Sequence, residues 1–350
     1  MNRNKILITG NLGYNGAAVV KCLNENGHYT IGLDIHYFQH YFYDDDSILP
    51  KEQIIKDVRE INESDFHNKL KNVDAVIHLA ALSNDALGEL DPKLTKDINE
   101  EASINLAKLC KKNNVKKFIY ASSCSVYGIQ DPKESAAENS PLKPLTAYAK
   151  AKLGTEMELI KMHSPEFKVI IMRNATMHGI SPKLRLDLVL NNLTACAHIF
   201  KKVKILSDGS PWRPLLSITD FANIILLFLE NDPKDIIYNI GFDEENFQIK
   251  DLGQMVSKTM KVPLEINPNN TPDERSYRVT FSKLKEEFPN LKIKESAEKS
   301  IKELQKYYQK YNLSEADFSG VKYFRIRTLK DLISMGIIDS KLKIKVTSIN

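Results

Sequence analysis

The chain has 350 residues, of which 42% are hydrophobic and 27% are charged, and its formal net charge is +4. This composition is that of a globular protein with a large core, which excludes a disordered chain, and so small a charge does not favour binding to nucleic acid or to a membrane surface. The four cysteines show neither metal-ligand spacing nor a disulfide framework, so we expect free thiols, a cytoplasmic protein and no metal site.

The first half of the chain alternates short apolar strands with amphipathic helices. We expect strands at residues 5–9, 29–33, 73–80, 117–122 and 168–172, and helices at 15–26, 94–113 and 147–163. Strands of near-continuous apolar character that are joined by helical crossovers are typical of a parallel sheet with both faces covered. The pattern therefore predicts an α/β fold with a doubly wound parallel sheet.

The second half is organised differently. Helices are expected near residues 186–200, 219–230, 250–260 and 297–311, joined by short strands and proline-containing loops. We predict two domains: residues 1–180 carry the parallel sheet, and residues 181–350 form a smaller mixed α/β lobe, partly interleaved with the first. The polar start of the chain runs straight into the first strand, and no apolar run is long enough to span a bilayer, so we expect neither a leader peptide nor a membrane anchor.

A glycine-rich turn lies between the first strand and the first helix. Gly10 allows a tight turn, Gly13 allows the backbone to approach a diphosphate, and Gly16 allows the helix to pack on the strand. The helix that starts near Tyr14 and Asn15 offers free N–H groups and a partial positive charge to phosphates. The turn therefore predicts a dinucleotide site.

Asp34 ends the second strand, where a carboxylate can accept hydrogen bonds from the adenosine ribose and would repel a 2′-phosphate. No arginine follows it, so NAD is favoured over NADP. Asp57 and Val58, at the end of the next short strand, are placed to meet the adenine. For Asp57 a solvated loop carboxylate is an equally weighted interpretation.

Tyr148 and Lys152 lie four residues apart near the start of a helix, so their side chains share one face. A neighbouring ammonium is expected to lower the pKa of the phenol from its usual value of about 10. Tyr148 can then take a hydroxyl proton as hydride leaves the carbon, and Lys152 can also bind the nicotinamide ribose. Ser123, at the end of a core strand, can hydrogen-bond the same substrate oxygen.

Together these motifs resemble the extended short-chain dehydrogenase/reductases of the NAD-dependent nucleotide-sugar epimerase/dehydratase group. The resemblance rests on residues 9–16, 78–81, 122–128 and 148–152, and on Arg213-Pro214-Leu215 followed by Asp220. It implies a Rossmann-type sheet, bound NAD, a nucleotide-sugar substrate and a homodimer.

The resemblance also assigns roles to residues. Ser123, Tyr148 and Lys152 would be the catalytic triad. The cofactor residues would include, besides those above, Leu79, Ala80, Ala81, Ser122 and the buried helix residue Asn99. The substrate residues would be Ser123, Asn192, Arg213 and Arg278, of which Asn192 and the two arginines fit phosphate- and base-contacting positions. Ser83 and Thr176, in two segments where the chain departs from the pattern of the group, are expected to lie beside the sugar as well. For Arg275 and Arg278 a surface role is an equally weighted interpretation.

Members of this group oxidise a sugar carbon, usually C4, and differ in the chemical step after that oxidation. Dehydratases usually place an acid and a base just after the catalytic serine, whereas this chain has Cys124 and Ser125 there, neither of which is a carboxyl. We therefore predict a nucleotide-sugar epimerase of surface-glycan or polysaccharide sugar biosynthesis. The alternatives are a nucleotide-sugar 4-dehydrogenase or ketoreductase that releases its product, then a 4,6-dehydratase or a non-catalytic NAD-binding protein.

Overall fold

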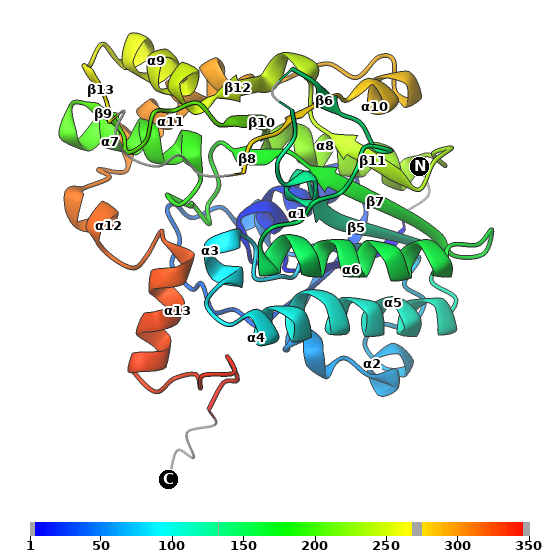
Figure 1. Cartoon of the computed structure of the whole chain (residues 1–350). Helices are drawn as coiled ribbons and strands as arrows, with labels where there is room; N and C mark the ends of the chain where they lie inside the picture. Colours follow the sequence, from blue (N-terminus) through cyan, green and yellow to red (C-terminus); the bar gives the residue numbers. More distant parts are fainter. Residues whose placement is uncertain (1–3, 132, 268–274, 346–350) are drawn as a thin grey trace.

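The computed structural model describes residues 4–131, 133–267 and 275–345. Its main feature is a seven-stranded sheet with the order β11-β7-β5-β4-β1-β2-β3 (Figure 1). All seven strands pair in parallel, so the doubly wound parallel sheet predicted from the sequence is confirmed. The strands are β1 (Lys5–Thr9), β2 (Tyr29–Asp34), β3 (Glu52–Ile55), β4 (Ala75–His78), β5 (Lys117–Ser123), β7 (Lys168–Asn174) and β11 (Ile237–Ile240).

Both faces of this sheet are covered by helices, as the continuous apolar strands require. In β1, Ile6 and Ile8 point into one hydrophobic core and Leu7 points into the other, because successive side chains of a strand alternate. The helices of the first face are α1 (Tyr14–Glu25) and α8 (Ile218–Glu230), and those of the second are α2 (Glu63–His67), α5 (Ala102–Lys112) and α6 (Ala147–Met162).

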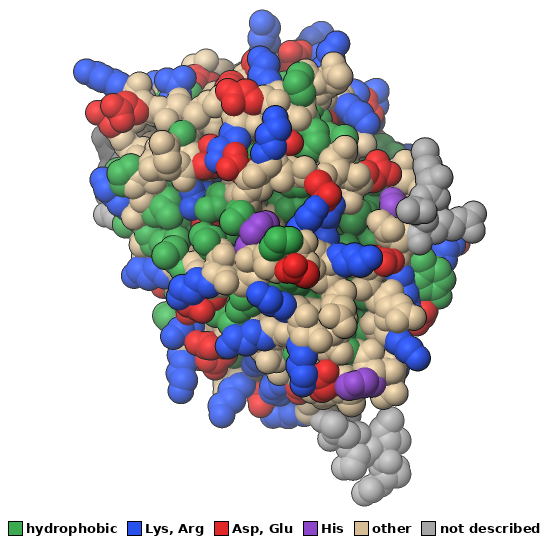
Figure 2. Space-filling model, turned by 90° about the vertical axis from the view of Figure 1, so that its right-hand side faces the viewer, with side chains coloured by type: hydrophobic (Ala, Val, Ile, Leu, Met, Phe, Trp, Pro, Cys, Tyr) green, Lys and Arg blue, Asp and Glu red, His purple; other side chains and the backbone are tan. Residues whose placement is uncertain are grey.

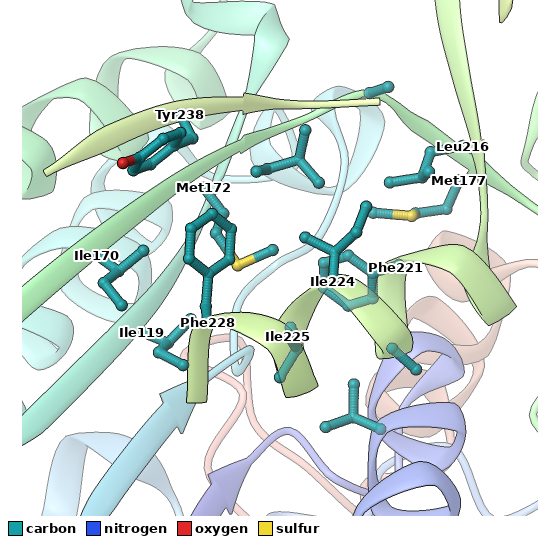
Figure 3. Close-up of a cluster of buried hydrophobic side chains, with 14 of the residues drawn as sticks. Ile119, Ile170, Met172, Met177, Leu216, Phe221, Ile224, Ile225, Phe228 and Tyr238 are labelled. Atoms are coloured by element: carbon teal, nitrogen blue, oxygen red, sulfur yellow. The ribbon is translucent and has the colours of Figure 1, made fainter. Parts of the chain in front are cut away.

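Helix α8 contributes four large apolar side chains to the first face. Phe221, Ile224, Ile225 and Phe228 point towards the sheet (Figure 3). The sheet residues they meet include Ile119, Ile170, Met172 and Tyr238. Each such side chain stabilises the fold by about 1.5–3 kcal/mol when fully buried. This packing ties a helix from the second half of the chain to the sheet of the first half.

The continuous helix expected at 94–113 is wrong in one respect, because it is interrupted. Helix α4 (Pro92–Lys96) is followed by a π-helical turn at Asp97–Glu101 and then by α5. Within this turn the Asn99 carbonyl accepts hydrogen bonds from the hydroxyls of Ser103 and Thr155, at 2.8 and 3.0 Å. Single π-turns of this kind often lie beside functional sites, and this one faces the loop after β4.

The remaining elements build a smaller lobe over the carboxyl ends of the large sheet (Figure 1). It has three small sheets, with the orders β12-β10-β8, β13-β9 and β14-β6. Residues 218–240 lie beyond the predicted boundary at residue 180 yet belong to the large sheet and its helical layer, and the division into two domains stays a prediction. The lobe and its connections comprise β6 (Ser135–Ala136), β8 (Thr176–His178), α7 (Val189–Phe200), β9 (Val203–Ile205), β10 (Trp212–Ser217), β12 (Asn246–Gln248), α9 (Ile249–Met260), β13 (Leu264–Ile266), β14 (Arg278–Val279), α10 (Ser282–Glu287), α11 (Ala297–Lys310) and α12 (Glu315–Ser319). Helix α13 (Arg325–Ser334), in contrast, packs on the hydrophobic core of the second face of the large sheet.

Charged side chains are spread over the molecular surface. Figure 2 shows one face on which basic and acidic side chains are interspersed, in line with the small net charge. Within the described ranges, no helix combines the length and the apolar character needed to cross a membrane.

Candidate active site

A cavity of about 510 Å³ lies at the carboxyl ends of the central strands. Residues that follow β1, β2, β4 and β5 line it, and β1 and β4 are neighbours in the sheet although they are not consecutive. Such a switch in strand order is where doubly wound sheets bind their ligands. The smaller lobe supplies the opposite wall through residues of the loop before α7, of β10 and of the segment before β14.

The glycine turn forms one end of this cavity. Gly10 has a positive φ of 73°, and a Cβ at this residue would lie 2.8 Å from the backbone nitrogen of Ala80. A Cβ at Gly16 would lie 2.2 Å from the Gly10 carbonyl oxygen, so neither position accepts a side chain. Helix α1 begins after Gly13 without a side-chain cap, and the side-chain oxygen of Asn15 has no partner. The residues of the turn therefore fit the diphosphate of a dinucleotide.

Asp34 and Asp57 line the same end of the cavity. The Asp34 carboxylate accepts the backbone N–H groups of Leu12 and His36 at 3.1 and 2.7 Å, and burial raises its pKa above the ordinary value. Asp57 is not a solvated loop carboxylate. Burial would raise its pKa, but hydrogen bonds from Arg59 outweigh that effect and lower it.

Helix α6 places Tyr148 and Lys152 on the cavity wall. The helix starts at the N-cap Thr146, whose side chain accepts the N–H of Ala149 and donates to Asp85 of α3 (Asp85–Gly88). Gly88 packs so closely on the helix that a Cβ there would lie 2.8 Å from the Cβ of Tyr148. The start of α6 is thus fixed by α3, which keeps Tyr148 in place.

The environment of Tyr148 differs from the sequence-based expectation. Burial raises the pKa of Tyr148, and the Asp85 carboxylate raises it further, while Ser123 acts in the opposite direction. The Nζ atom of Lys152 lies 5.7 Å from the centre of the Tyr148 ring and donates to the Ala121 carbonyl at 2.7 Å. Lys152 is 3% exposed, and burial lowers the pKa of this amine to about 7.

A buried ion pair lies behind the catalytic residues. Arg173 on β7 contacts Glu156 on α6 at 2.8 Å, and Glu156 also accepts a hydrogen bond from the Ser122 hydroxyl. All three side chains are buried. The pair thereby joins α6 to β5 and β7 next to Ser123 and Lys152.

Next to Ser83, the cavity wall carries a second network. The Arg185 guanidinium binds Asp187 through two hydrogen bonds of 2.8 and 3.1 Å and donates to the Ser83 hydroxyl at 3.0 Å. Asn84 donates to Asp187 at 3.1 Å. Ser83 is therefore held from the smaller lobe, on the same side as Tyr148.

Two further arginines of the smaller lobe line the cavity. Arg275 forms an ion pair with Asp85, and Arg213 donates to the Arg275 carbonyl at 2.5 Å. The Arg213 guanidinium also lies 5.2 Å from the centre of the Tyr277 ring. Together they place two guanidinium groups on the wall of the cavity that the smaller lobe supplies.

Most residues predicted for the site line this one cavity. Those that do are Gly10, Gly13, Tyr14, Asn15, Gly16, Asp34, Asp57, Val58, Leu79, Ala80, Ala81, Ser83, Ser122, Ser123, Tyr148, Lys152, Thr176 and Arg213. Three do not line it. Asn99 bonds the backbone of Leu82, Asn192 donates to the Leu186 carbonyl, and Arg278 lies over the Trp212 ring.

Several other lining residues carry no local signal in the sequence. Arg185, Asp187, Tyr277 and Arg325 come from loops or from the helix near the end of the chain, outside the recognised motifs. Arg275, for which a surface role has equal weight on the sequence alone, lines the cavity where Arg278 does not. Only the tertiary structure brings these side chains to the strand ends.

Comparisons with known proteins agree with this geometry. The model of the NAD dependent epimerase/dehydratase family matches residues 6–241. Protein CapI of Staphylococcus aureus is 28% identical to this chain, over 63% of this chain and 68% of its own length. The UDP-glucose 4-epimerase of Pisum sativum is 30% identical, over 48% of this chain and 51% of its own length. The structure of a UDP-glucose 4-epimerase from Thermotoga maritima has a TM-score of 0.76 and 24% identity, over 87% of this chain and 99% of its own.

Proposed function

The chain belongs to the NAD-dependent epimerase/dehydratase family, and from that membership we propose that it is a nucleotide-sugar 4-epimerase. The observation that carries the proposal is the presence of Ser123, Tyr148 and Lys152 on one wall of the cavity that also contains the glycine turn. NAD, when bound, accepts hydride from the sugar carbon and returns it.

The three residues divide the proton chemistry between them. Tyr148 takes the proton of the C4 hydroxyl in the oxidation and returns it in the reduction, and Ser123 hydrogen-bonds the same oxygen. Burial raises the pKa of Tyr148, so in the protein alone the phenol is protonated at neutral pH and must release that proton before it can take the proton of the C4 hydroxyl. The positive charge of an oxidised nicotinamide, when bound nearby, would favour this release. Lys152, with a pKa lowered to about 7 by burial, holds the nicotinamide ribose.

The residues after Ser123 support epimerisation over dehydration. Asp85 and Asp187, which also line the cavity, are each engaged in an ion pair, with Arg275 and with Arg185. Cys124 is buried, and its thiol donates to the Arg173 carbonyl. Elimination of water needs an acid and a base beside the sugar, and the residues after Ser123 supply neither.

The smaller lobe provides the groups for the rest of the substrate. Arg213 and Arg275 suit a diphosphate, since the guanidinium fork matches a pair of phosphate oxygens. Ser83 and Thr176 border the sugar. Asn192 and Arg278 stay predictions as nucleotide contacts.

We further propose a setting and an assembly for this enzyme. It acts in surface-glycan or polysaccharide sugar biosynthesis, in the cytoplasm, as a homodimer. Helices α5 and α6 are the proposed dimer face, and the exposed Met157 on α6 lies within it.

The test is direct. The purified protein is denatured and its bound nucleotides are identified by mass spectrometry, and the native protein is then incubated with UDP-glucose, UDP-glucuronic acid and UDP-N-acetylglucosamine. Proton NMR is expected to show the C4 epimer of at least one of them without net NADH. Accumulation of NADH with a released keto-sugar would indicate a dehydrogenase, and loss of one water from the sugar would indicate a dehydratase.

A further inference from the structure

Arg325, the first residue of helix α13, is a cation inside the cavity. Its side chain is 3% exposed, and its guanidinium lies 4.3 Å from the centre of the Phe38 ring. One of its nitrogens donates to the Lys183 carbonyl at 2.8 Å. Among the described residues, no carboxylate forms an ion pair with it, in contrast to Arg185 and Arg275 in the same cavity.

A buried guanidinium without an anionic partner is unfavourable, so its position calls for a ligand. Burial lowers the pKa of Arg325 to about 9, and it therefore remains positively charged at neutral pH. Lys183 lies directly behind it, with its own ammonium bonded to the Phe38 carbonyl at 2.8 Å. Two cations thus lie close together at a point where Asp187 and Asp34 act on the charge of Arg325 without forming an ion pair with it.

The neighbours of Arg325 locate this point along the cavity. The charge of Arg325 is influenced by Arg185, Asp187, Asp34 and Tyr14, and all of these side chains line the same cavity. Asp34 is the residue predicted to bind the adenosine ribose, and Tyr14 is the first residue of the helix after the glycine turn. Arg325 therefore lies near both the predicted ribose position and the start of α1.

The end of the chain holds α13 in this place. Leu342 is fully buried, and its carbonyl accepts hydrogen bonds from the Tyr37 hydroxyl and from Arg59. Lys343 forms ion pairs with Asp57 and Glu60, at 3.1 and 2.7 Å. The C-terminal segment is thus fastened to the wall that carries Asp34 and Asp57, which fixes Arg325 over the site.

We propose that Arg325 binds the diphosphate of NAD from the side opposite the glycine turn, so that the C-terminal helix completes the cofactor site. A charged donor from α13 would meet the phosphate oxygens that face away from the N–H groups of α1. This inference rests on the NAD requirement of the family and not on the proposed epimerisation.

The test compares ligands that contain and lack the diphosphate. Full-length protein freed of bound nucleotide is titrated calorimetrically with ADP-ribose, adenosine and 2′-phospho-ADP-ribose, for the wild type, Arg325→Gln, Arg325→Lys and the exposed control Lys330→Gln. Arg325→Gln is expected to lower the affinity for ADP-ribose roughly ten- to a hundredfold, as for a lost charge-assisted hydrogen bond. The affinity for adenosine is expected to stay unchanged. Lys330→Gln is expected to bind all three as the wild type does.

Several outcomes would overturn the proposal. If Arg325→Gln loses affinity equally for ADP-ribose and adenosine, the role of Arg325 is structural. If it loses affinity for neither ligand, Arg325 does not contact a phosphate. If the wild type binds 2′-phospho-ADP-ribose more tightly than ADP-ribose and Arg325→Gln loses this preference, Arg325 contacts a 2′-phosphate and not the diphosphate. If Arg325→Gln does not fold, Arg325→Lys carries the test, with a severalfold loss expected for ADP-ribose alone. ADP-ribose and adenosine are fragments of the cofactor and no turnover takes place in these titrations, so their result is independent of the proposed reaction.

Discussion

At the scale of single residues, Tyr148 is proposed to transfer a proton although its phenol is buried. Desolvation and the Asp85 carboxylate both raise the pKa of its phenol, whereas Ser123 and Arg185 lower it. The protein alone therefore keeps Tyr148 protonated at neutral pH. A protonated phenol can serve the reduction half of an epimerisation, whereas the oxidation half needs the phenolate, so Tyr148 must lose its own proton before it takes that of the C4 hydroxyl.

Replacing Tyr148 by phenylalanine removes this proton without changing the packing of the ring. We expect Tyr148→Phe to lower kcat by a factor on the order of 100 to 10,000, as for the loss of a general acid-base group, while NAD is still bound. Turnover is measured by NMR and NAD binding by calorimetry. Tyr29→Phe, which changes an exposed phenol bonded to Glu52, is the control and is expected to be fully active. Near-normal turnover of Tyr148→Phe would show that the catalytic assignment is wrong.

Lys152 gives a prediction on stability and pH. Burial lowers its pKa to about 7 in the folded protein, against about 10.4 in an unfolded chain, so folding releases its proton between these values. Below pH 7 the burial of the charged Lys152 amine lowers the free energy of unfolding by its full amount. This loss disappears as the pH rises towards 10. Lys152→Met is therefore expected to be more stable than the wild type at pH 7, with the difference shrinking by about 1.4 kcal/mol per pH unit between pH 8 and pH 10.

Urea unfolding of the wild type and Lys152→Met at pH 7, 8 and 9 checks this expectation. Lys150→Met, at an exposed position on the same helix, is the control and should show a pH-independent difference. A constant difference between wild type and Lys152→Met would mean that the Lys152 amine keeps its ordinary pKa in the folded protein.

At the scale of elements, helix α6 is held at both ends of its catalytic face. Asp85 and Glu89 bond its first turn, and the buried Glu156–Arg173 pair bonds its middle to β7. Glu156 follows Lys152 by four residues and lies on the same side of the helix. The position of the helix is therefore set by contacts that also fix Ser122.

Breaking the Glu156–Arg173 pair is expected to be costly. Glu156→Gln leaves the Arg173 guanidinium buried without its carboxylate, and we expect a loss of about 3 kcal/mol in the free energy of unfolding. Glu158→Gln, two residues further along the same helix, removes a surface pair with Lys161 and should change that free energy by less than about 0.5 kcal/mol. Urea unfolding compares the two. A loss no larger than that of Glu158→Gln would contradict the role assigned to the buried pair.

The strands show what the sequence could predict at this scale. β1 has the expected limits, and β2, β5 and β7 extend one or two residues beyond them, because runs of buried apolar residues identify strands of a covered sheet. The π-turn at Asp97–Glu101 could not be predicted, since the apolar periodicity does not show that Ser103 and Thr155 share the Asn99 carbonyl. The raised pKa of Tyr148 could not be predicted either, because its main cause is the burial of the phenol in the folded protein.

At the scale of the whole molecule, the candidate site depends on segments that are distant in sequence. Local motifs predicted the glycine turn, Asp34 and the Ser123–Tyr148–Lys152 set, since each follows a strand or starts a helix. Arg185 and Arg325 belong to no such motif and reach the cavity only through the folding of the smaller lobe and of the C-terminal segment. Their chemistry could not be predicted before their position was known.

The end of the chain offers a last prediction at this scale. Leu342 is 0% exposed, and its carbonyl binds Tyr37 and Arg59, which line the adenosine end of the cavity. Leu342→Ala removes buried contacts, so hydrogen exchange of residues 337–345 should speed up and NAD should bind severalfold more weakly, while the exposed control Met335→Ala changes neither. Exchange is measured by mass spectrometry and NAD affinity by calorimetry. Faster exchange of the segment with unchanged NAD affinity would show that the C-terminal segment covers the sheet edge without shaping the cofactor site.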